Sequence, residues 1–288
     1  MPRLVTSSLP YTPHAFHNGR WHGVGHPDVV AFFRDVPAIE RLPVQPDTMI
    51  YMQRPNLVCE VQLPAAGNLP WSRVIIKRFG WRGMQHYLLS PLKRSKAIKA
   101  YRTACHLLTY HLGTPLPLGA FEGRRWGFIQ YNAYITEAIT GYITLREYCR
   151  TLPDGLQGVA EVLQLTADYT RRMHDSGLWH RDLFLSNFLL LGPPGARQLY
   201  LVDLNRSYRL PYMPLALRTL DIARMEWREW QPQFIALYCA ERFPVAPVLC
   251  LARLYSRWRT WRWRLLQRIK PLRQRLRRRW DEANRRSP

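Results

Sequence analysis

The chain of 288 residues lacks several features that would place it in a common class of protein. No run of 18 uncharged apolar residues occurs, so we expect no membrane-spanning helix. The first residues, MPRLVTSSLPYTPHAF, contain no continuous apolar stretch, so no secretory signal peptide is predicted. Internal repeats and low-complexity stretches are also missing before the C-terminal tail. These absences favour a chain that stays in the cytoplasm or faces it.

Cysteine is scarce and shows no pairing pattern. The five cysteines are single and contain no CxxC spacing: Cys59, Cys105, Cys149, Cys239 and Cys250. Scattered single cysteines in an odd number are typical of a reducing compartment. We therefore expect them to be small buried apolar residues rather than disulfide or metal ligands.

Acidic residues are few. The sequence has 20 Asp and Glu against 42 Lys and Arg, which gives a formal net charge of +22. Residues 253–288 alone carry fourteen basic residues against two acids. This balance predicts an anionic partner, which could be a nucleic acid, an acidic membrane surface or a polyphosphorylated substrate. No recognised nucleic-acid-binding motif is present, so nucleic acid is not expected as a partner.

Hydrophobic residues make up 47% of the chain, enough for a buried core. Residues 1–46, rich in Pro, His and Gly, are predicted to form a loosely structured lead-in. Residues 47–138 are then predicted to form a small antiparallel lobe of five strands with one helix. The strands are expected at Met49–Met52, at Leu57–Leu63, at Val74–Ile76, and as a pair within Phe121–Ile139 around a turn at Glu122-Gly123, with the helix at Ser95–Leu112.

The pattern changes to helices in residues 139–270. Helices are predicted at Thr144–Leu152, at Val159–Asp175 and from Leu217 onward, with two short strands, Phe188–Leu191 and Leu199–Val202, around the turn Gly192–Gly195. Residues 271–288 form a basic tail. A strand-rich lobe followed by a larger helical lobe predicts an α+β, bilobal fold.

The strongest motif lies in the helical part. Residues 180–187 (HRDLFLSN) match the pattern HRDLxxxN of a kinase catalytic loop, between a predicted helix and a predicted strand. Asp203 follows Asp182 by 21 residues at the end of an apolar run, and Lys77 ends a predicted strand like the lysine of a VAIK motif. Their order and spacing predict an enzyme that transfers a phosphoryl group.

Each of these residues has a role that phosphoryl transfer requires, because this reaction depends on positioning and charge neutralisation. Asp182 would accept the proton of the acceptor hydroxyl as catalytic base. Asn187 and Asp203 would offer oxygen ligands to Mg²⁺. Lys77 would hold the phosphates of the nucleotide as a point charge.

Longer segments resemble the lipopolysaccharide kinases of Gram-negative bacteria, the Kdo and heptose kinases of the inner core. They are Met173–Leu191 (MHDSGLWHRDLFLSNFLLL) and Leu201–Arg206 (LVDLNR), the latter similar to the acidic-then-arginine motif that this family has where protein kinases have DFG. Ser95–Pro117 resembles the family's helix, followed by a Gly-x-x-x-Pro strand entry. The resemblance covers residues 57–209.

The resemblance implies a protein-kinase-like fold, the use of ATP and Mg²⁺, and a lipopolysaccharide core sugar as acceptor. Tyr134–Gly141 (YITEAITG) is similar to the hinge of the family. The backbone of Glu137 and Ala138 is therefore expected to contact adenine.

The sequence also departs from the family pattern. Asn205 replaces the glycine of DFG, although asparagine tolerates a positive φ better than most residues. No glycine-rich loop lies between the first two strands, where Arg54-Pro55-Asn56 stands instead. Ala100 occupies the position of the helix glutamate that should pair with Lys77. Either another acid such as Glu60 is the partner, or the lysine is held differently, or the activity is weak.

Apolar residues recur at steps of three and four near the C-terminus and line one helical face: Leu254, Trp258, Trp261, Leu265, Ile269, Leu272 and Leu276. Pro271 is expected to kink this helix. Basic amphipathic helices with tryptophan are typical of membrane surfaces. Residues 251–269 could instead be the last helix of the core, whereas Arg273–Trp280 has too little apolar area for one.

We therefore predict an ATP-dependent kinase for a sugar hydroxyl of a lipopolysaccharide inner-core intermediate, in the cytoplasm and peripheral on the inner membrane. One alternative is a kinase for another lipid-linked or small-molecule sugar. The other is a pseudokinase, a membrane-docked binding module without turnover, which Ala100 and the missing glycine loop favour. The presence of Asp182, Asn187 and Asp203 opposes it.

Overall fold

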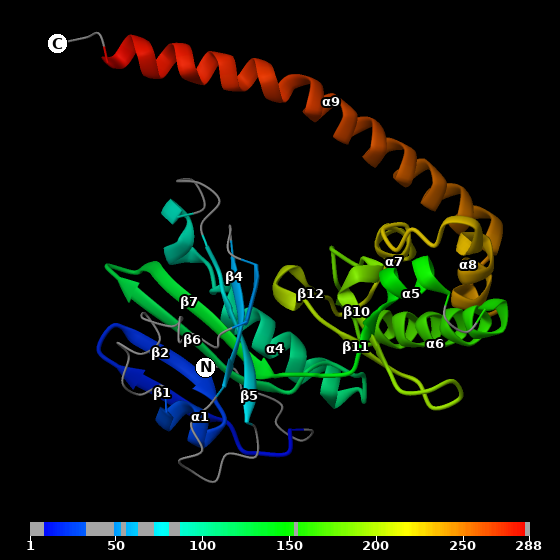
Figure 1. The fold of residues 1–288 in the computed structure, drawn as a ribbon, viewed down its shortest axis with the longest axis horizontal. Coiled ribbons are helices and arrows are strands. Elements are labelled where there is room, and N and C mark those ends of the chain that lie inside the picture. The colour runs from blue at the N-terminus through cyan, green and yellow to red at the C-terminus, as the bar shows by residue number, and fades with distance from the viewer. Residues whose placement is uncertain are drawn as a thin grey trace.

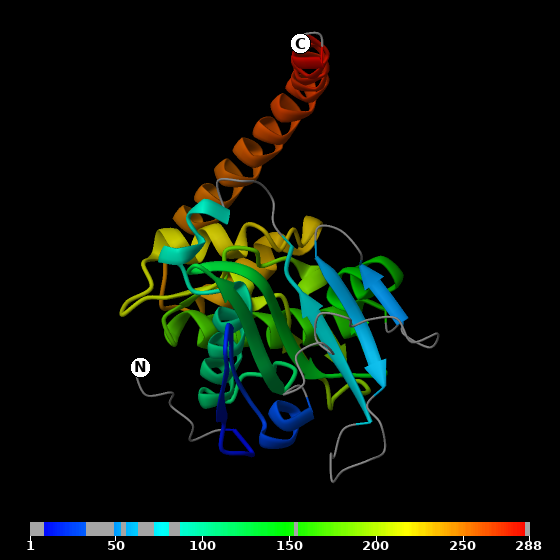
Figure 2. The ribbon, with the colours of Figure 1, turned by 90° about the vertical axis from the view of Figure 1, so that its left-hand side faces the viewer.

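The computed structural model of the chain describes residues 9–32, 49–52, 56–62, 72–80, 87–152 and 155–285, with side chains except at 155–156 and 269–285. A strand-rich lobe and a helical lobe lie side by side, and one long helix projects from the helical lobe (Figures 1 and 2). This arrangement confirms the predicted α+β class with two lobes.

The first lobe is a seven-stranded antiparallel sheet in the order β1-β2-β6-β7-β5-β4-β3. Its strands are β1 (His14–Asn18), β2 (Trp21–Gly25), β3 (Met49–Met52), β4 (Leu57–Gln62), β5 (Arg73–Arg78), β6 (Pro117–Arg125) and β7 (Phe128–Glu137). Buried side chains alternate with more exposed ones along β4 and β5, so one face of each strand is buried. The three strands predicted in residues 49–76 are confirmed.

Of the predicted lead-in, residues 1–46, the structure describes residues 9–32, and these form regular elements rather than a loose segment. The strands β1 and β2 extend the sheet beyond β6, and the short helix α1 (Pro27–Phe32) packs against them. Phe16, Trp21 and Val29 are buried against β6 and β7, which supplies the free energy for ordering this segment. The sequence analysis missed these elements because Pro, His and Gly, which are typical of loops, surround the three buried residues.

The turn expected at Glu122-Gly123 was also misplaced. Both residues lie inside β6, and the chain reverses at Trp126-Gly127, where both residues have positive φ. Gly123 is needed for packing, since a Cβ there would come within 2.9 Å of the Trp21 ring. A glycine that makes room for a side chain therefore resembled a turn signal.

The helix α4 (Lys96–Thr109) lies between the lobes (Figure 1). Ser95 caps its N-terminus by accepting a hydrogen bond from the backbone N–H of Ile98. Its buried residues, including Ala100 and Tyr101, belong to the same apolar cluster as the core of the helical lobe. The helix consequently packs the sheet against the helical lobe.

The second lobe agrees with the predicted elements. Its helices are α5 (Leu145–Thr151), α6 (Gly155–Asp175), α7 (Leu215–Ile222), α8 (Gln231–Cys239) and α9 (Val245–Arg285), and its short strands are β8 (Ile143–Thr144), β9 (Leu178–Trp179), β10 (Phe188–Leu191), β11 (Gln198–Leu201) and β12 (Tyr208–Arg209). Thr144 and Glu147 form a reciprocal capping box at the start of α5. All five cysteines are free, and three are buried.

The helix α9 leaves the body after its first turns (Figure 2). Val248 and Ala252 are buried against the lobe, but Leu254, Trp258 and Trp261 are 47–60% exposed. The interpretation of residues 251–269 as a core helix therefore fails beyond the first turns. The helix also continues through Pro271, so the kink expected there does not end it. In the described part of the chain, no helix, α9 included, is long and apolar enough to cross a membrane.

Candidate active site

The segment 180–187 forms a loop that ends in a short 3-10 helix, Leu185–Asn187, and leads into β10. Leu183 and Leu185 are buried and fasten the loop to the core. The side-chain Nδ2 of Asn187 donates a 2.8 Å hydrogen bond to the backbone O of Asp182. The loop therefore holds Asp182 in one conformation and ties Asn187 to it.

Asp221 on α7 anchors this loop, and the sequence analysis did not identify it. Its carboxylate is completely buried and accepts hydrogen bonds from the backbone N–H of His180 (2.8 Å) and of Arg181 (2.9 Å). Arg181 has a φ of 68°, a conformation that a non-glycine residue keeps only when its surroundings impose it. A single acid within the apolar sequence of α7 was the available signal.

Lys77 forms an ion pair with Asp203 across the lobes. Burial acts to raise the pKa of Asp203, but the ammonium of Lys77 together with His180 and Arg206 outweighs it, so the pKa falls below its ordinary value. Glu60, suggested as a partner for the lysine, instead accepts hydrogen bonds from Arg73 (2.9 Å) and Tyr51 (2.7 Å). The lysine is thus held by Asp203, and Glu60 is excluded as its partner.

Ala100 is 1% exposed and faces the core rather than the site. The residues of α4 that line the site are Lys96 and Lys99. This helix consequently brings positive charge to the place where the family pattern has a glutamate.

Asp182 is paired as well. Its Oδ2 lies 3.0 Å from a guanidinium nitrogen of Arg206, whose side chain is 45% exposed. The arginine is the last residue of the LVDLNR segment, and the sequence analysis assigned no role to it. The pairing keeps a cation at the carboxylate expected to act as the base.

The two expected metal ligands are connected through the backbone. The N–H of Val202, beside Asp203, donates to the backbone O of Asn187 (2.9 Å). Because Nδ2 of Asn187 is used as a donor, its Oδ1 remains an acceptor, and Asp203 adds a carboxylate. In the described ranges no group of three or more His, Cys, Asp or Glu could hold a metal by itself. One carboxylate and one amide fit Mg²⁺, which keeps much of its shell as water and phosphate.

The expected adenine contacts lie apart from these groups. Glu137 ends β7 and, with Ala138, is not among the residues that line the cavity. The backbone N–H of Glu137 donates to Leu116 O (3.1 Å), and that of Ala138 donates to Arg73 O (3.3 Å). Both donors are engaged, so their contact with a nucleotide base stays a prediction.

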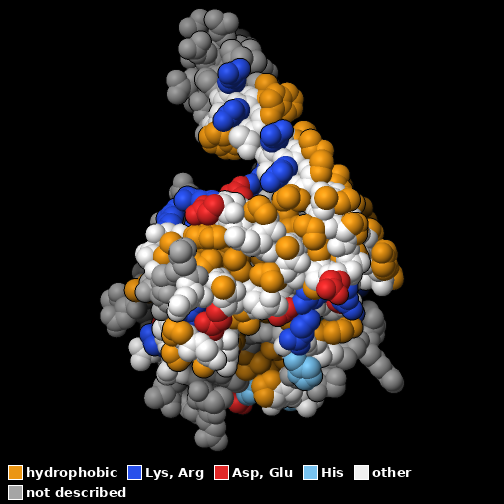
Figure 3. Space-filling model, turned by 90° about the vertical axis from the view of Figure 1, so that its right-hand side faces the viewer, with side chains coloured by type: hydrophobic (Ala, Val, Ile, Leu, Met, Phe, Trp, Pro, Cys, Tyr) orange, Lys and Arg blue, Asp and Glu red, His pale blue; other side chains and the backbone are white. Residues whose placement is uncertain are grey.

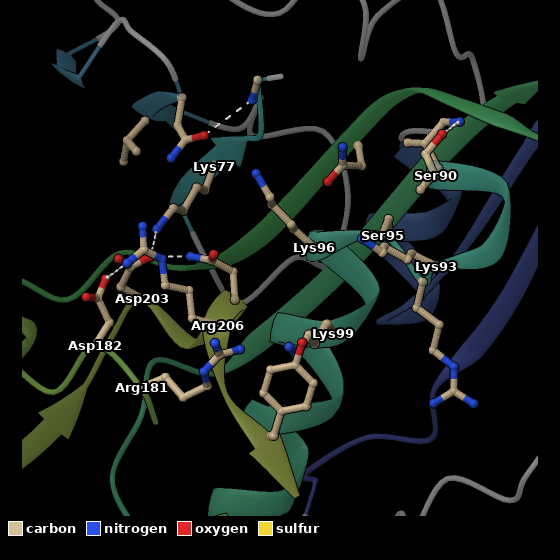
Figure 4. A pocket seen from close by; sticks show the side chains of 18 of the residues that line it. Lys77, Ser90, Lys93, Ser95, Lys96, Lys99, Arg181, Asp182, Asp203 and Arg206 are labelled. Carbon is tan, nitrogen blue, oxygen red and sulfur yellow. Dashed lines mark hydrogen bonds and ion pairs between the residues drawn. The ribbon is translucent and has the colours of Figure 1, made fainter. Parts of the chain in front are cut away.

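A cavity of about 500 Å³ between the lobes brings Lys77, Asp182 and Asp203 together. Seven basic side chains line it: Lys77, Lys93, Arg94, Lys96, Lys99, Arg181 and Arg206. Among the described residues two acids, Asp182 and Asp203, line it, and each of these is paired with one of the cations. Figure 4 shows Lys77 reaching Asp203, and Arg206 reaching Asp182. The cavity therefore has a strong excess of positive charge.

Two histidines at the loop are buried, His174 in α6 and His180 at the start of the loop itself. Burial lowers the pKa of both His174 and His180, so both are neutral near pH 7. The Nδ1 of His174 lies 2.7 Å from the hydroxyl of Tyr238. Their positions in the core favour structural roles.

Comparisons with known proteins agree with this geometry. Residues 77–236, more than half of the chain, match the family described as "Lipopolysaccharide kinase (Kdo/WaaP) family". The solved structure titled "WaaP in complex with acyl carrier protein" superposes with a TM-score of 0.61 over 82% of this chain and 98% of that chain, at 16% identity. That likeness establishes a shared fold. A search of curated proteins found no match.

Proposed function

Since the chain belongs to the lipopolysaccharide kinase (Kdo/WaaP) family and is therefore a kinase, we propose its reaction as follows. It transfers the γ-phosphoryl group of ATP to a sugar hydroxyl of a lipopolysaccharide inner-core intermediate at the cytoplasmic face of the inner membrane. The observation that carries this proposal is the meeting of Asp182, Lys77 and Asp203 in one cationic cavity.

Asp182 acts as the base in this proposal. It accepts the proton of the sugar hydroxyl and orients the oxygen toward the phosphoryl group. Arg206, already 3.0 Å from this carboxylate, is placed to contact the transferred group and balance its charge. The hydrogen bonds from the loop to Asp221 keep the base in position.

Lys77 and Asp203 handle the nucleotide. The ammonium of Lys77 would bind the phosphates, while Asp203 and Oδ1 of Asn187 would hold Mg²⁺. When bound, Mg²⁺ would neutralise phosphate charge. The carbonyl groups of Glu137 and Ala138 would contact adenine, because their N–H groups already donate to protein carbonyls.

The acceptor in this proposal is lipid-linked and anionic, in keeping with the excess of cations in the cavity. Exposed apolar and basic side chains lie together along α9 where it leaves the body (Figure 3). We place this helix on an anionic membrane surface, with the apolar residues in the interface and the arginines at the head groups. The expected basic run, Arg273–Arg286, lies in the part whose side chains are not described.

Phosphate transfer tests the proposal directly. The purified protein is incubated with labelled ATP and a series of core-truncated lipopolysaccharides, and the phosphorylated hydroxyl is located by mass spectrometry. Label on an inner-core sugar that requires Mg²⁺ supports the proposal. Label on other sugars alone would support the alternative acceptor, and nucleotide binding without any transfer would support a pseudokinase.

A further inference from the structure

Two cations of the cavity share one aromatic ring. The Nζ of Lys99 lies 3.4 Å from the ring centroid of Tyr208, and the guanidinium carbon of Arg181 lies 4.9 Å from the same centroid. Lys99 comes from α4 and Tyr208 from β12, whereas Arg181 belongs to the catalytic loop. Figure 4 shows Lys99 and Arg181 close to each other beside Arg206.

This pair has no counter-charge in the part of the chain that the structure describes. The two acids of the cavity are engaged by Lys77 and Arg206, and no carboxylate there forms an ion pair with Lys99 or Arg181. Burial, together with the charge of Arg181, lowers the pKa of Lys99 to about 8. Two like charges held together are unfavourable until an anion joins them.

The backbone holds this arrangement in place. The left-handed conformation of Arg181 is maintained by the buried carboxylate of Asp221, which accepts its N–H. The side chain of Arg181 also stacks over Trp179, with 5.0 Å between the guanidinium carbon and the ring centroid. Backbone strain and the repulsion between Lys99 and Arg181 therefore both occur at Arg181, the residue before Asp182.

We propose that Lys99 and Arg181 bind a phosphate or carboxylate group of the acceptor, adjacent to the hydroxyl that Asp182 orients. The inference rests on the proposed function and adds a specificity subsite to it. Arg181 directly precedes Asp182, so an anion on this pair lies beside the reacting hydroxyl. The phosphates of the nucleotide are assigned to Lys77, which pairs with Asp203. An acceptor that lacks the anionic group is consequently a poor substrate.

The test compares Lys99→Gln with Lys99→Arg and with Arg146→Gln. Arg146 is exposed on α5 and does not line this cavity, so its loss matches the change in net charge. For Lys99→Gln we expect the KM of a core-truncated lipopolysaccharide to rise about ten- to hundredfold, with the KM of ATP within about twofold. Lys99→Arg restores most of the loss, and Arg146→Gln stays near wild type.

The source of the anion is identified with modified acceptors. One lipopolysaccharide has its phosphates removed, and another has its carboxylates esterified. The modification that removes the bound group raises the KM of wild type and abolishes the difference between wild type and Lys99→Gln. A rise in the KM of ATP alone would assign the pair to the nucleotide, and unchanged constants for both substrates would overturn the subsite.

A second measurement does not depend on turnover. Inorganic phosphate is titrated into wild type, Lys99→Gln and Arg146→Gln while the melting temperature is recorded. We expect phosphate to stabilise wild type and Arg146→Gln more than Lys99→Gln. Equal stabilisation of all three proteins contradicts the subsite. A failure of the proposed function is a different result, since wild type would then phosphorylate no lipopolysaccharide, whatever phosphate binding shows.

Discussion

The two walls of the cavity treat charge in opposite ways. On the acidic wall, formed by the catalytic loop and the LVDLNR segment, Asp182 and Asp203 are each paired with a cation of the protein, Arg206 and Lys77. At the wall formed by α4, Lys99 shares the ring of Tyr208 with Arg181 of the catalytic loop, and in the described residues neither cation forms an ion pair with an acid. The fold itself therefore balances the acids, whereas in the subsite proposed above an anion of the acceptor would balance the two cations.

The largest effect is expected from removing the base on the acidic wall. Asp182→Ala is predicted to lower kcat by about 10³-fold or more, because Asp182 is the group proposed to take the proton of the hydroxyl. Folding and ATP affinity should stay near wild type, since the proposed contact of Asp182 is with the acceptor. The measurement is single-turnover transfer together with nucleotide titration. Asp168→Ala, which removes a partly buried acid of α6 paired with Arg171, is the control, and turnover within tenfold of wild type would exclude Asp182 as the base.

A smaller loss is expected from the acid that faces the nucleotide. Asp203→Asn is predicted to weaken Mg·ATP binding by about 10²-fold, because it removes a charged ligand from a hard cation and the partner of Lys77. Nucleotide binding without Mg²⁺ changes much less. Titrations of ATP with and without Mg²⁺ into both proteins measure the difference. Equal affinities would make this segment a structural turn.

The third change tests whether Asp221 of α7 positions the catalytic loop of the acidic wall. In Asp221→Asn, an amide must face two backbone N–H donors with one oxygen, which leaves a donor unsatisfied. We expect the free energy of unfolding to fall by about 1–3 kcal/mol. The value of kcat should fall more than KM rises. Denaturant unfolding and kinetics on the same samples check this. A stability loss with unchanged kcat would show that Asp221 serves the fold alone.

The smallest effect concerns basic charge far from the cavity. Deleting residues 273–288 should lower activity on lipid-embedded acceptor several-fold, with little effect on delipidated acceptor. Each basic residue near an anionic surface contributes about 1 kcal/mol at most, and salt screens this attraction. Co-sedimentation with anionic vesicles at low and high salt, together with a melting curve, measures the effect.

Two results would contradict this docking. Salt-insensitive sedimentation with a large fall in melting temperature would mean that the helix packs on the body. Unchanged co-sedimentation of the truncated protein would mean that the deleted residues do not bind the vesicles.

Much of the fold was predictable because its signals are local. The strands at 49–52 and 73–78 follow short apolar runs, and α4 and α5 begin at capping residues that are visible in the sequence. The turn assigned to Gly123 was wrong because that glycine makes room for the ring of Trp21, about a hundred residues earlier in the chain. A requirement set by a distant side chain leaves no mark on the residues beside it.

The same division holds for the site. The sequence by itself determined the HRDLxxxN segment and predicted the roles of Asp182, Asn187, Asp203 and Lys77, since the chemistry of phosphoryl transfer restricts both residue type and spacing. Only the tertiary structure decided how their charges are balanced. It paired Lys77 with Asp203 rather than Glu60, buried Ala100, and anchored the loop on an acid of α7. Electrostatic partners depend on distance in space, and residues of different elements acquire that distance only when the chain has folded.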